Sequence, residues 1–267
     1  MTLNITPKFS NPPLKETFCS VSFQDISDMH APQLGAFWEK IREDYPITET
    51  HVPLPPISMH QDTQFTLQLQ FMPPQLPRTW FIHKNKSSII QIQRDRLIFN
   101  WRQLPSLMKY PSFEILSAEF ISIFNKFNAF CLSDLGNKVE LNGLELGYVN
   151  TIPLNNCEMS TSTFSDIFPN IFNVGKKSLL QKMGRINCNM QFNLPDNNGN
   201  LHISLNSMQQ QEDGTQAIRL DLSSKWISPM IVETDLKDWF DKAHEFTVAS
   251  FVDITSEENH KNWGRTQ

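Results

Sequence analysis

The residue types that carry zinc chemistry are present in this chain, but their spacing does not fit a metal site. His244-Glu245 lies on a predicted helix, and the second histidine of an H-E-x-x-H zinc helix would fall at Val248. We therefore expect His244 to make one hydrogen bond where this helix contacts a sheet. The four cysteines are far apart and form no C-x-x-C pair. The sequence predicts no metal and no cofactor.

Nucleophilic and phosphate-binding motifs give no better case for an enzyme. The sequence contains no G-x-S-x-G, G-x-x-x-x-G-K-[ST] or G-x-G-x-x-G, and glycine is scarce at 9 residues. A catalytic cysteine needs a base beside its thiolate. Cys19 instead lies in a predicted strand and Cys131 at the end of an apolar helical stripe, so we expect both thiols in the core. No catalytic residue is predicted.

The most suggestive polar side chains lie on a predicted hairpin. If Arg94-Asp95 is its two-residue turn, Ile92 lies opposite Leu97 and Ile90 lies opposite Phe99 on an apolar face. The opposite face then carries the polar residues of both strands. These candidate site residues are Gln91, Gln93, Arg96, Asn100 and Arg102.

Three interpretations of this polar hairpin face stay open. It could receive a partner chain or an anionic ligand, because arginine gives planar bidentate recognition. It could be a plain solvated face, as on many antiparallel sheets that are covered on one side. It could also be the surface through which two halves of the chain pack.

The elements that position this hairpin follow one order twice. The first half has predicted elements at 18–23, 31–44, 64–71, 80–83, 89–93, 96–102 and 112–132, with a proline connector at 52–56. The second half has them at 139–152, 164–172, 186–192, 201–205, 218–222 and 234–254. Each half ends in a Phe-rich helix, in which Phe120, Phe124, Phe240 and Phe246 are expected to serve as core.

This order predicts an α+β fold of two similar subdomains. Each is an antiparallel β-meander packed on one face by a long C-terminal helix, a duplicated β-α-β(n)-α unit. We place a leader at 1–10, the first subdomain at 11–134 and the second at 135–267. Both subdomains would be of ordinary size.

Composition argues against nucleic acid and a membrane as partners. The formal net charge is −5, from 23 basic and 28 acidic residues, and no basic run is present. The N-terminus lacks the apolar region of a signal peptide, and no stretch approaches about 18 apolar residues. We therefore expect a soluble cytoplasmic protein that binds neither nucleic acid nor membrane.

Several short motifs occur in an ordered series. They are Pro12-Pro13-Leu14-Lys15-Glu16, Tyr45-Pro46, Gly147-Tyr148-Val149-Asn150, His244 with Phe251, and Trp263-Gly264. In this order they resemble a bacterial family called "sporadically distributed protein", whose function is unknown, over about residues 11–265. Gly147 stands where that family would have an arginine, which removes a possible charged site. The resemblance implies an accessory gene, of the kind found in defence and toxin–antitoxin systems.

The first functional hypothesis is a non-enzymatic interaction module that binds a partner protein, such as the product of a neighbouring gene. The alternative is a small-ligand-binding protein with a cavity of a few hundred Å³ between a long helix and a curved sheet. An enzyme of unrecognised type is the third hypothesis.

Overall fold

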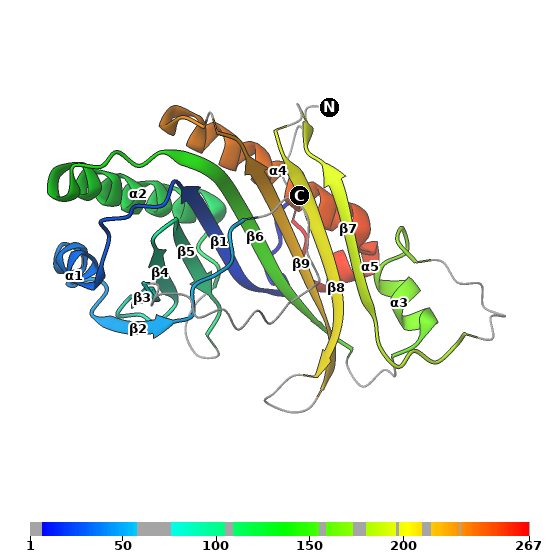
Figure 1. Ribbon diagram of the computed structural model, residues 1–267. Helices are drawn as coiled ribbons and strands as arrows, with labels where there is room; N and C mark the ends of the chain where they lie inside the picture. The colour runs from blue at the N-terminus through cyan, green and yellow to red at the C-terminus, as the bar shows by residue number, and fades with distance from the viewer. Residues whose placement is uncertain are drawn as a thin grey trace. The chain divides into compact units, whose positions relative to one another are not determined.

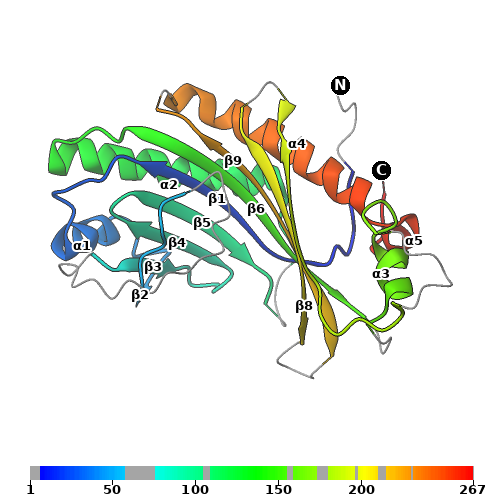
Figure 2. The ribbon, with the colours of Figure 1, turned by 45° about the vertical axis from the view of Figure 1, so that its right-hand side comes forward.

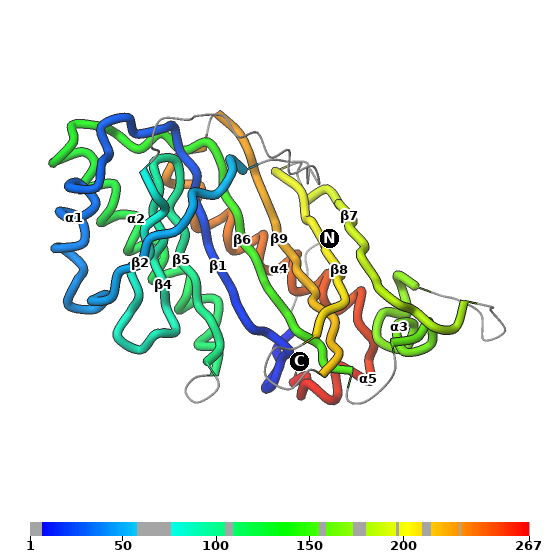
Figure 3. The backbone as a smooth tube through the Cα atoms, turned by 60° about the horizontal axis from the view of Figure 1, so that its bottom comes forward, coloured from blue at the N-terminus to red at the C-terminus, as the bar shows by residue number. Residues whose placement is uncertain are grey.

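The computed structural model describes residues 7–57, 76–104, 109–154, 159–172, 180–195, 198–209, 215–229 and 231–266. Over these residues the chain has the predicted α+β fold, with five α-helices and nine strands in one antiparallel sheet (Figures 1 and 3). The strand order is β2-β3-β4-β5-β1-β6-β9-β8-β7.

The strands are bounded as follows: β1 Leu14–Phe23, β2 Ile47–His51, β3 Arg78–Ile82, β4 Ser88–Gln93, β5 Arg96–Arg102, β6 Leu141–Pro153, β7 Asn187–Asn193, β8 Asn200–Gln209 and β9 Gln216–Ile227. The helices are α1 Ala31–Glu39, α2 Phe113–Leu135, α3 Thr161–Ile167, α4 Leu236–Ile254 and α5 Glu257–Asn262, with a short 3₁₀ turn at Glu233–Asp235.

The chain divides into two compact units that do not follow the predicted halves. Unit 1 contains Met1–Lys15, Gly147–Ser224 and Asp241–Gln267, and unit 2 contains Glu16–Leu146 and Lys225–Phe240. Strands β1, β6 and β9 and helix α4 each have residues in both units. The duplication into subdomains 11–134 and 135–267 is not confirmed and stays a prediction.

In unit 2, strands β2, β3, β4, β5 and β1 pair in succession, each antiparallel to the next. Gln93 pairs with Arg96, which confirms the two-residue turn between β4 and β5. Ile92 lies opposite Leu97, as predicted from the alternation of apolar residues. The hairpin register is therefore the predicted one.

Helix α2 supplies the apolar cover of unit 2 (Figure 2). It begins at the N-cap Ser112, whose hydroxyl accepts from the Ile115 amide, and ends at Gly136 in the left-handed conformation, with φ of 68°. Its apolar side chains recur at helical spacing and are buried. They are Phe113, Leu116, Phe120, Ile123, Phe124, Phe127 and Phe130.

Aromatic packing joins this helix to the rest of the unit 2 core. The ring of Phe127 lies 5.6 Å from that of Phe23 on β1 and 5.5 Å from that of Phe37 on α1. Phe120 lies 5.2 Å from Phe240. The predicted core positions Phe120, Phe124 and Phe240 are confirmed, each at 0% exposure.

Helix α2 is also long and apolar enough to cross a membrane, judged by length and composition alone. Core helices share these properties, and the Phe stripe of α2 is buried.

In unit 1, helix α4 contacts the sheet through polar pairs as well as apolar side chains. The hydroxyl of Tyr148 on β6 and Nδ1 of His244 on α4 form a hydrogen bond of 2.6 Å. Ser224 on β9 and Thr247 on α4 are joined at 2.8 Å, and both are buried. The expectation that His244 bonds where the last helix contacts a sheet is confirmed. Phe246 is only half-buried, so its prediction as a core residue is not confirmed.

The two chain ends that the structure describes meet in unit 1. Phe9 pairs with Arg265 in an isolated β-bridge, and its ring lies 5.7 Å from Phe251 and 5.8 Å from His260. Trp263 packs at 5.3 Å from Phe251. Helix α5, which contributes His260 to this cluster, was not predicted, because its six residues are too few for a helical period to show.

Other differences from the predicted elements have local causes. The first helix ends at Glu39 rather than at residue 44. A hydrogen bond of 2.8 Å from the Trp38 indole to the Tyr45 carbonyl stabilises the turn that follows. Strand β2 was missed because four of its five residues are polar and its residues are mostly exposed, so no apolar alternation shows. The predicted strand at 64–71 and the predicted turn at Asp213-Gly214 lie outside the described residues.

Candidate functional site

The five predicted site residues lie on one face of the β4–β5 hairpin in unit 2, as expected. The side chains of Gln91, Gln93, Arg96 and Asn100 are, however, buried, with exposures of 6%, 4%, 5% and 4%. Arg102 is half-buried, and its Nε donates to the Lys86 carbonyl at 3.0 Å. The interpretation of a plain solvated face is therefore wrong for the four buried residues.

The amide of Gln93 fastens the connector after β2 to the hairpin. Its Oε1 accepts from the Leu54 amide at 2.9 Å, and its Nε2 donates to the Leu54 carbonyl at 3.1 Å. Nε2 also donates to Asp95 in the hairpin turn at 2.6 Å. Next to it, Nη2 of Arg96 donates to the Pro55 carbonyl at 2.8 Å. Two predicted site residues thus position the connector backbone.

Gln91 and Asn100 belong to a second polar chain. Nε2 of Gln91 donates to Oδ1 of Asn100 at 2.6 Å, and Nδ2 of Asn100 donates in turn to the Glu16 carboxylate on β1. Asn100 thus has its donor and its acceptor occupied. The chain crosses three neighbouring strands, β4, β5 and β1.

The strand pairing adds residues that the sequence analysis missed. One row across the sheet, from β2 to β1, runs through Glu49, Trp80, Gln91, Ile98 and Ser20. The neighbouring row carries His51 paired with Arg78, and Gln93 paired with Arg96, which in turn pairs with Ser22. We call this surface the polar face. It comprises Glu16, Ser20, Ser22, Glu49, His51, Arg78, Trp80, Gln91, Gln93, Arg96, Asn100 and Arg102.

Aromatic contacts order the β2–β3 side of the polar face. The rings of His51 and Trp80 lie 4.0 Å apart with an interplanar angle of 31°. The Arg78 guanidinium lies over the Trp80 ring at 5.6 Å from its centroid. His51 also contacts the Glu49 carboxylate at 3.1 Å. Alternation within β3 could have indicated that Arg78 and Trp80 share a face, but not which face.

Among the described residues of the polar face, five buried polar atoms have no hydrogen-bond partner within the structure. They are Nε of Arg78, Nε1 of Trp80, Oε1 of Gln91, Nε of Arg96 and Oγ of Ser20. Leaving a buried polar group unpaired costs about 1–3 kcal/mol, so native proteins contain few of them. Here they occur on two adjacent rows of one sheet.

The charges on the polar face are mixed. Burial lowers the pKa of Arg96, while Glu145 on β6 and Asp95 act in the opposite direction. The pKa of Arg78 is also lowered, first by burial and then by the charge of Arg96. Glu145 pairs with Lys225 on β9 at 3.6 Å. The two arginines therefore repel each other, and among the described residues carboxylates act on Arg96 but not on Arg78.

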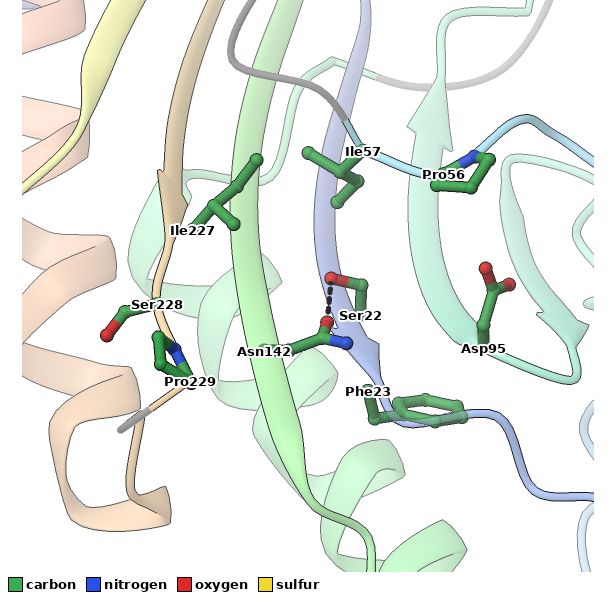
Figure 4. Close-up of a pocket in the computed structure, with 9 residues that line it drawn as sticks. All are labelled: Ser22, Phe23, Pro56, Ile57, Asp95, Asn142, Ile227, Ser228 and Pro229. Atoms are coloured by element: carbon green, nitrogen blue, oxygen red, sulfur yellow. Dashed lines mark hydrogen bonds between the residues drawn. The ribbon is translucent and has the colours of Figure 1, made fainter.

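A pocket of about 270 Å³ adjoins the Arg96 end of the polar face (Figure 4). It is lined by Ser22, Phe23, Pro56, Ile57, Asp95, Asn142, Ile227, Ser228 and Pro229. The Ser22 hydroxyl donates to Oδ1 of Asn142 at 2.7 Å at its centre. No described residue of α2 lines the pocket, so it differs in place from the helix–sheet cavity of the small-ligand hypothesis.

Chemistry by thiols or metals has little support among the described residues. Cys19 and Cys131 are fully buried, as predicted, and burial raises the pKa of both thiols. Within the described ranges no group of three or more His, Cys, Asp or Glu residues could hold a metal ion. What the polar face can do chemically is bind, through guanidinium, indole and amide groups.

No family model matches the chain, and neither curated proteins nor solved structures give a match. The resemblance to the "sporadically distributed protein" family stays a prediction.

Proposed function

We propose that this chain is a non-enzymatic protein-interaction module, which binds its partner on the polar face of unit 2 and in the adjoining pocket. The observation that carries the proposal is the set of five unpartnered buried polar atoms on two rows of the sheet. A partner that supplies the missing hydrogen bonds would recover the free energy that these groups lose in the unbound protein.

The size of the pocket supports a protein partner. At about 270 Å³ it lies just below the range of about 300–1,000 Å³ typical of small-molecule sites. Such a volume suits one anchoring side chain of a partner, the kind of contact that dominates many protein interfaces. Its lining, with apolar Ile57 and Ile227 beside polar Ser22 and Asn142, suits an amphipathic anchor.

A small-ligand-binding protein is the second candidate, favoured by the same pocket. The two candidates differ in what the pocket residues would contact. A small ligand would be enclosed by the pocket and leave the rest of the polar face unchanged. A protein would cover the β2–β3 side as well.

We further propose that the chain arose by duplication and serves an accessory bacterial system, with the product of a neighbouring gene as its partner. The strand order supports the duplication, because β3-β4-β5-β1 is followed by the mirrored series β6-β9-β8-β7. In chain order, a helix follows the first strand of each series, α1 after β1 and α3 after β6. Another helix follows the last strand, α2 after β5 and α4 after β9. The accessory role rests on the family resemblance alone.

The test is co-purification of the tagged chain with the product of the adjacent gene. We would compare the wild type with Ile227→Asp, which places a charge on a pocket residue that is 37% exposed. Leu132→Asp is the matched control, since Leu132 is 62% exposed on α2 and outside the polar face. The proposal expects capture by the wild type and the control, and loss with Ile227→Asp. Capture that all three proteins share equally would contradict a partner site in the pocket.

A further inference from the structure

We propose that the polar face holds an oxyanion, a phosphoryl group or a carboxylate, between Arg78, Trp80 and Arg96. The inference rests on the proposed function, because it names the chemical group of the partner that this face would bind. It adds a site with defined donors, which can be tested without knowledge of the partner.

Three N–H groups make the case for an acceptor. Nε of Arg78, Nε of Arg96 and Nε1 of Trp80 are all shielded from solvent, and none has an acceptor within the structure. Arg96 uses Nη2 on the Pro55 carbonyl, and its Nε has no acceptor within the structure. A guanidinium edge matches the geometry of carboxylate and phosphate oxygens, and such charge-assisted bonds are about twice as strong as neutral ones.

Two of the three unpartnered donors belong to guanidinium groups, which favours an anion as the acceptor. Arg96 has Glu145 and Asp95 as nearby carboxylates, but Glu145 also pairs with Lys225 at 3.6 Å. Within the described part of the chain, the neighbouring charge that acts on Arg78 is the positive charge of Arg96. A neutral carbonyl group would leave this repulsion in place, whereas an oxyanion between the two guanidinium groups removes it.

The remaining unpartnered atoms describe the surroundings of the anion. Oε1 of Gln91, directly opposite Trp80, is an acceptor. Ser20 lies farther along the same row, beyond Ile98, and its hydroxyl can donate or accept. A ligand that carries an N–H or O–H group beside its oxyanion would satisfy the Gln91 acceptor. An anionic side chain followed by a main-chain amide has this arrangement.

The test is an NMR titration of the purified full chain with sodium phosphate and, separately, sodium acetate, both at constant ionic strength. We expect saturable shifts of the Trp80 indole N–H and of the Arg78 and Arg96 Nε–H signals, because these are the unpartnered donors. The Nε–H of Arg219, bonded to Asp221 at 2.8 Å in unit 1, serves as the internal control. Saturation by phosphate alone identifies a phosphoryl site, and saturation by acetate identifies a carboxylate site. No saturation by either anion overturns the proposal.

Variants then separate geometry from charge. Arg78→Gln and Arg96→Gln should each weaken the binding of the saturating anion by about tenfold or more, as expected for one charge-assisted hydrogen bond. Arg96→Lys keeps the charge but lacks the Nε donor, and should also weaken binding. Arg219→Gln should leave it unchanged. Equal affinity in wild type and all three site variants would overturn the proposal, and circular dichroism of each variant verifies its fold.

The anion site and the proposed function fail in different ways. If the partner is captured equally by wild type, Arg78→Gln and Arg96→Gln, and neither anion saturates, the site is refuted while the interaction stands. If an anion saturates the site but the adjacent gene product is not captured, the anion site stands and that partner is refuted.

Discussion

Replacing Gln93 with leucine tests how much the stability of the protein depends on the hydrogen bonds that join Gln93 to the connector after β2. The Gln93 amide makes two hydrogen bonds to the Leu54 backbone, at 2.9 and 3.1 Å, and one to Asp95 at 2.6 Å. Each contributes about 0.5–1.5 kcal/mol net, and the substitution also leaves two backbone groups without their partner. The buried leucine offsets part of this loss.

We expect Gln93→Leu to lower the free energy of unfolding by about 2 kcal/mol, measured by urea denaturation. For a chain of this size that corresponds to a fall in Tm of about 4–8 °C. Hydrogen exchange gives a local readout, since the Leu54 amide loses its acceptor and should exchange faster.

Gln91→Leu is the matched control on the same strand and face. Gln91 makes one hydrogen bond, to Asn100, and its Oε1 has no partner within the structure. Removing an unpaired acceptor offsets the loss of this hydrogen bond, so we expect the free energy of unfolding to change by no more than about 1 kcal/mol. If Gln91→Leu destabilises the protein as much as Gln93→Leu, or Leu54 exchanges at the wild-type rate in Gln93→Leu, the connector argument is refuted.

Three further predictions concern the fold. Gly136→Ala should lower the free energy of unfolding by about 1 kcal/mol, because the φ of Gly136 is 68°. Gly35→Ala, in open space on α1, should raise it by about 0.5–1 kcal/mol. Changes of the same sign in thermal unfolding would contradict this pair of predictions. Burial chiefly lowers the pKa of His260, so the unfolded chain takes up this proton at a higher pH than the folded chain does. The free energy of unfolding should therefore keep its full His260 contribution above about pH 6.5 and lose it as the pH falls. A Tm that stays level from about pH 7.5 to 5.5, after correction with His260→Gln, would contradict this. Phe127→Ala should lower the free energy of unfolding, measured by urea denaturation, by about 3–5 kcal/mol. Leu132→Ala, at a residue that is 62% exposed, should change it by no more than about 0.5 kcal/mol. Similar losses in the two variants would refute the assigned core.

The hairpin at β4–β5 shows how much local sequence could predict. A two-residue turn and strict alternation determine which residues lie opposite one another, because side chains alternate between faces with a period of two. The predicted pairs of Ile92 with Leu97 and Ile90 with Phe99 are therefore confirmed. The Phe stripe of α2 was predictable for the same reason, with a period of 3.6 residues.

The burial of the polar face was not predictable in this way. Alternation assigns Gln91, Gln93, Arg96 and Asn100 to one face, but polar residues on a sheet are ordinarily exposed. Their burial depends on residues distant in sequence, such as the connector carbonyl of Pro55, 41 residues before Arg96. Local sequence therefore indicates the shared face of these residues but not their burial.

The sequence by itself determined the α+β class, most strands and helices, the hairpin register and the Phe-rich core, since these follow from periodicity and turn chemistry within short windows. The tertiary structure decided that one sheet contains strands of both predicted halves, because strand pairing joins segments far apart in the chain. It also decided that Arg78 and Trp80 share a face with Arg96. That juxtaposition concentrates unpaired donors on one surface, and it arises from strand order rather than from any motif.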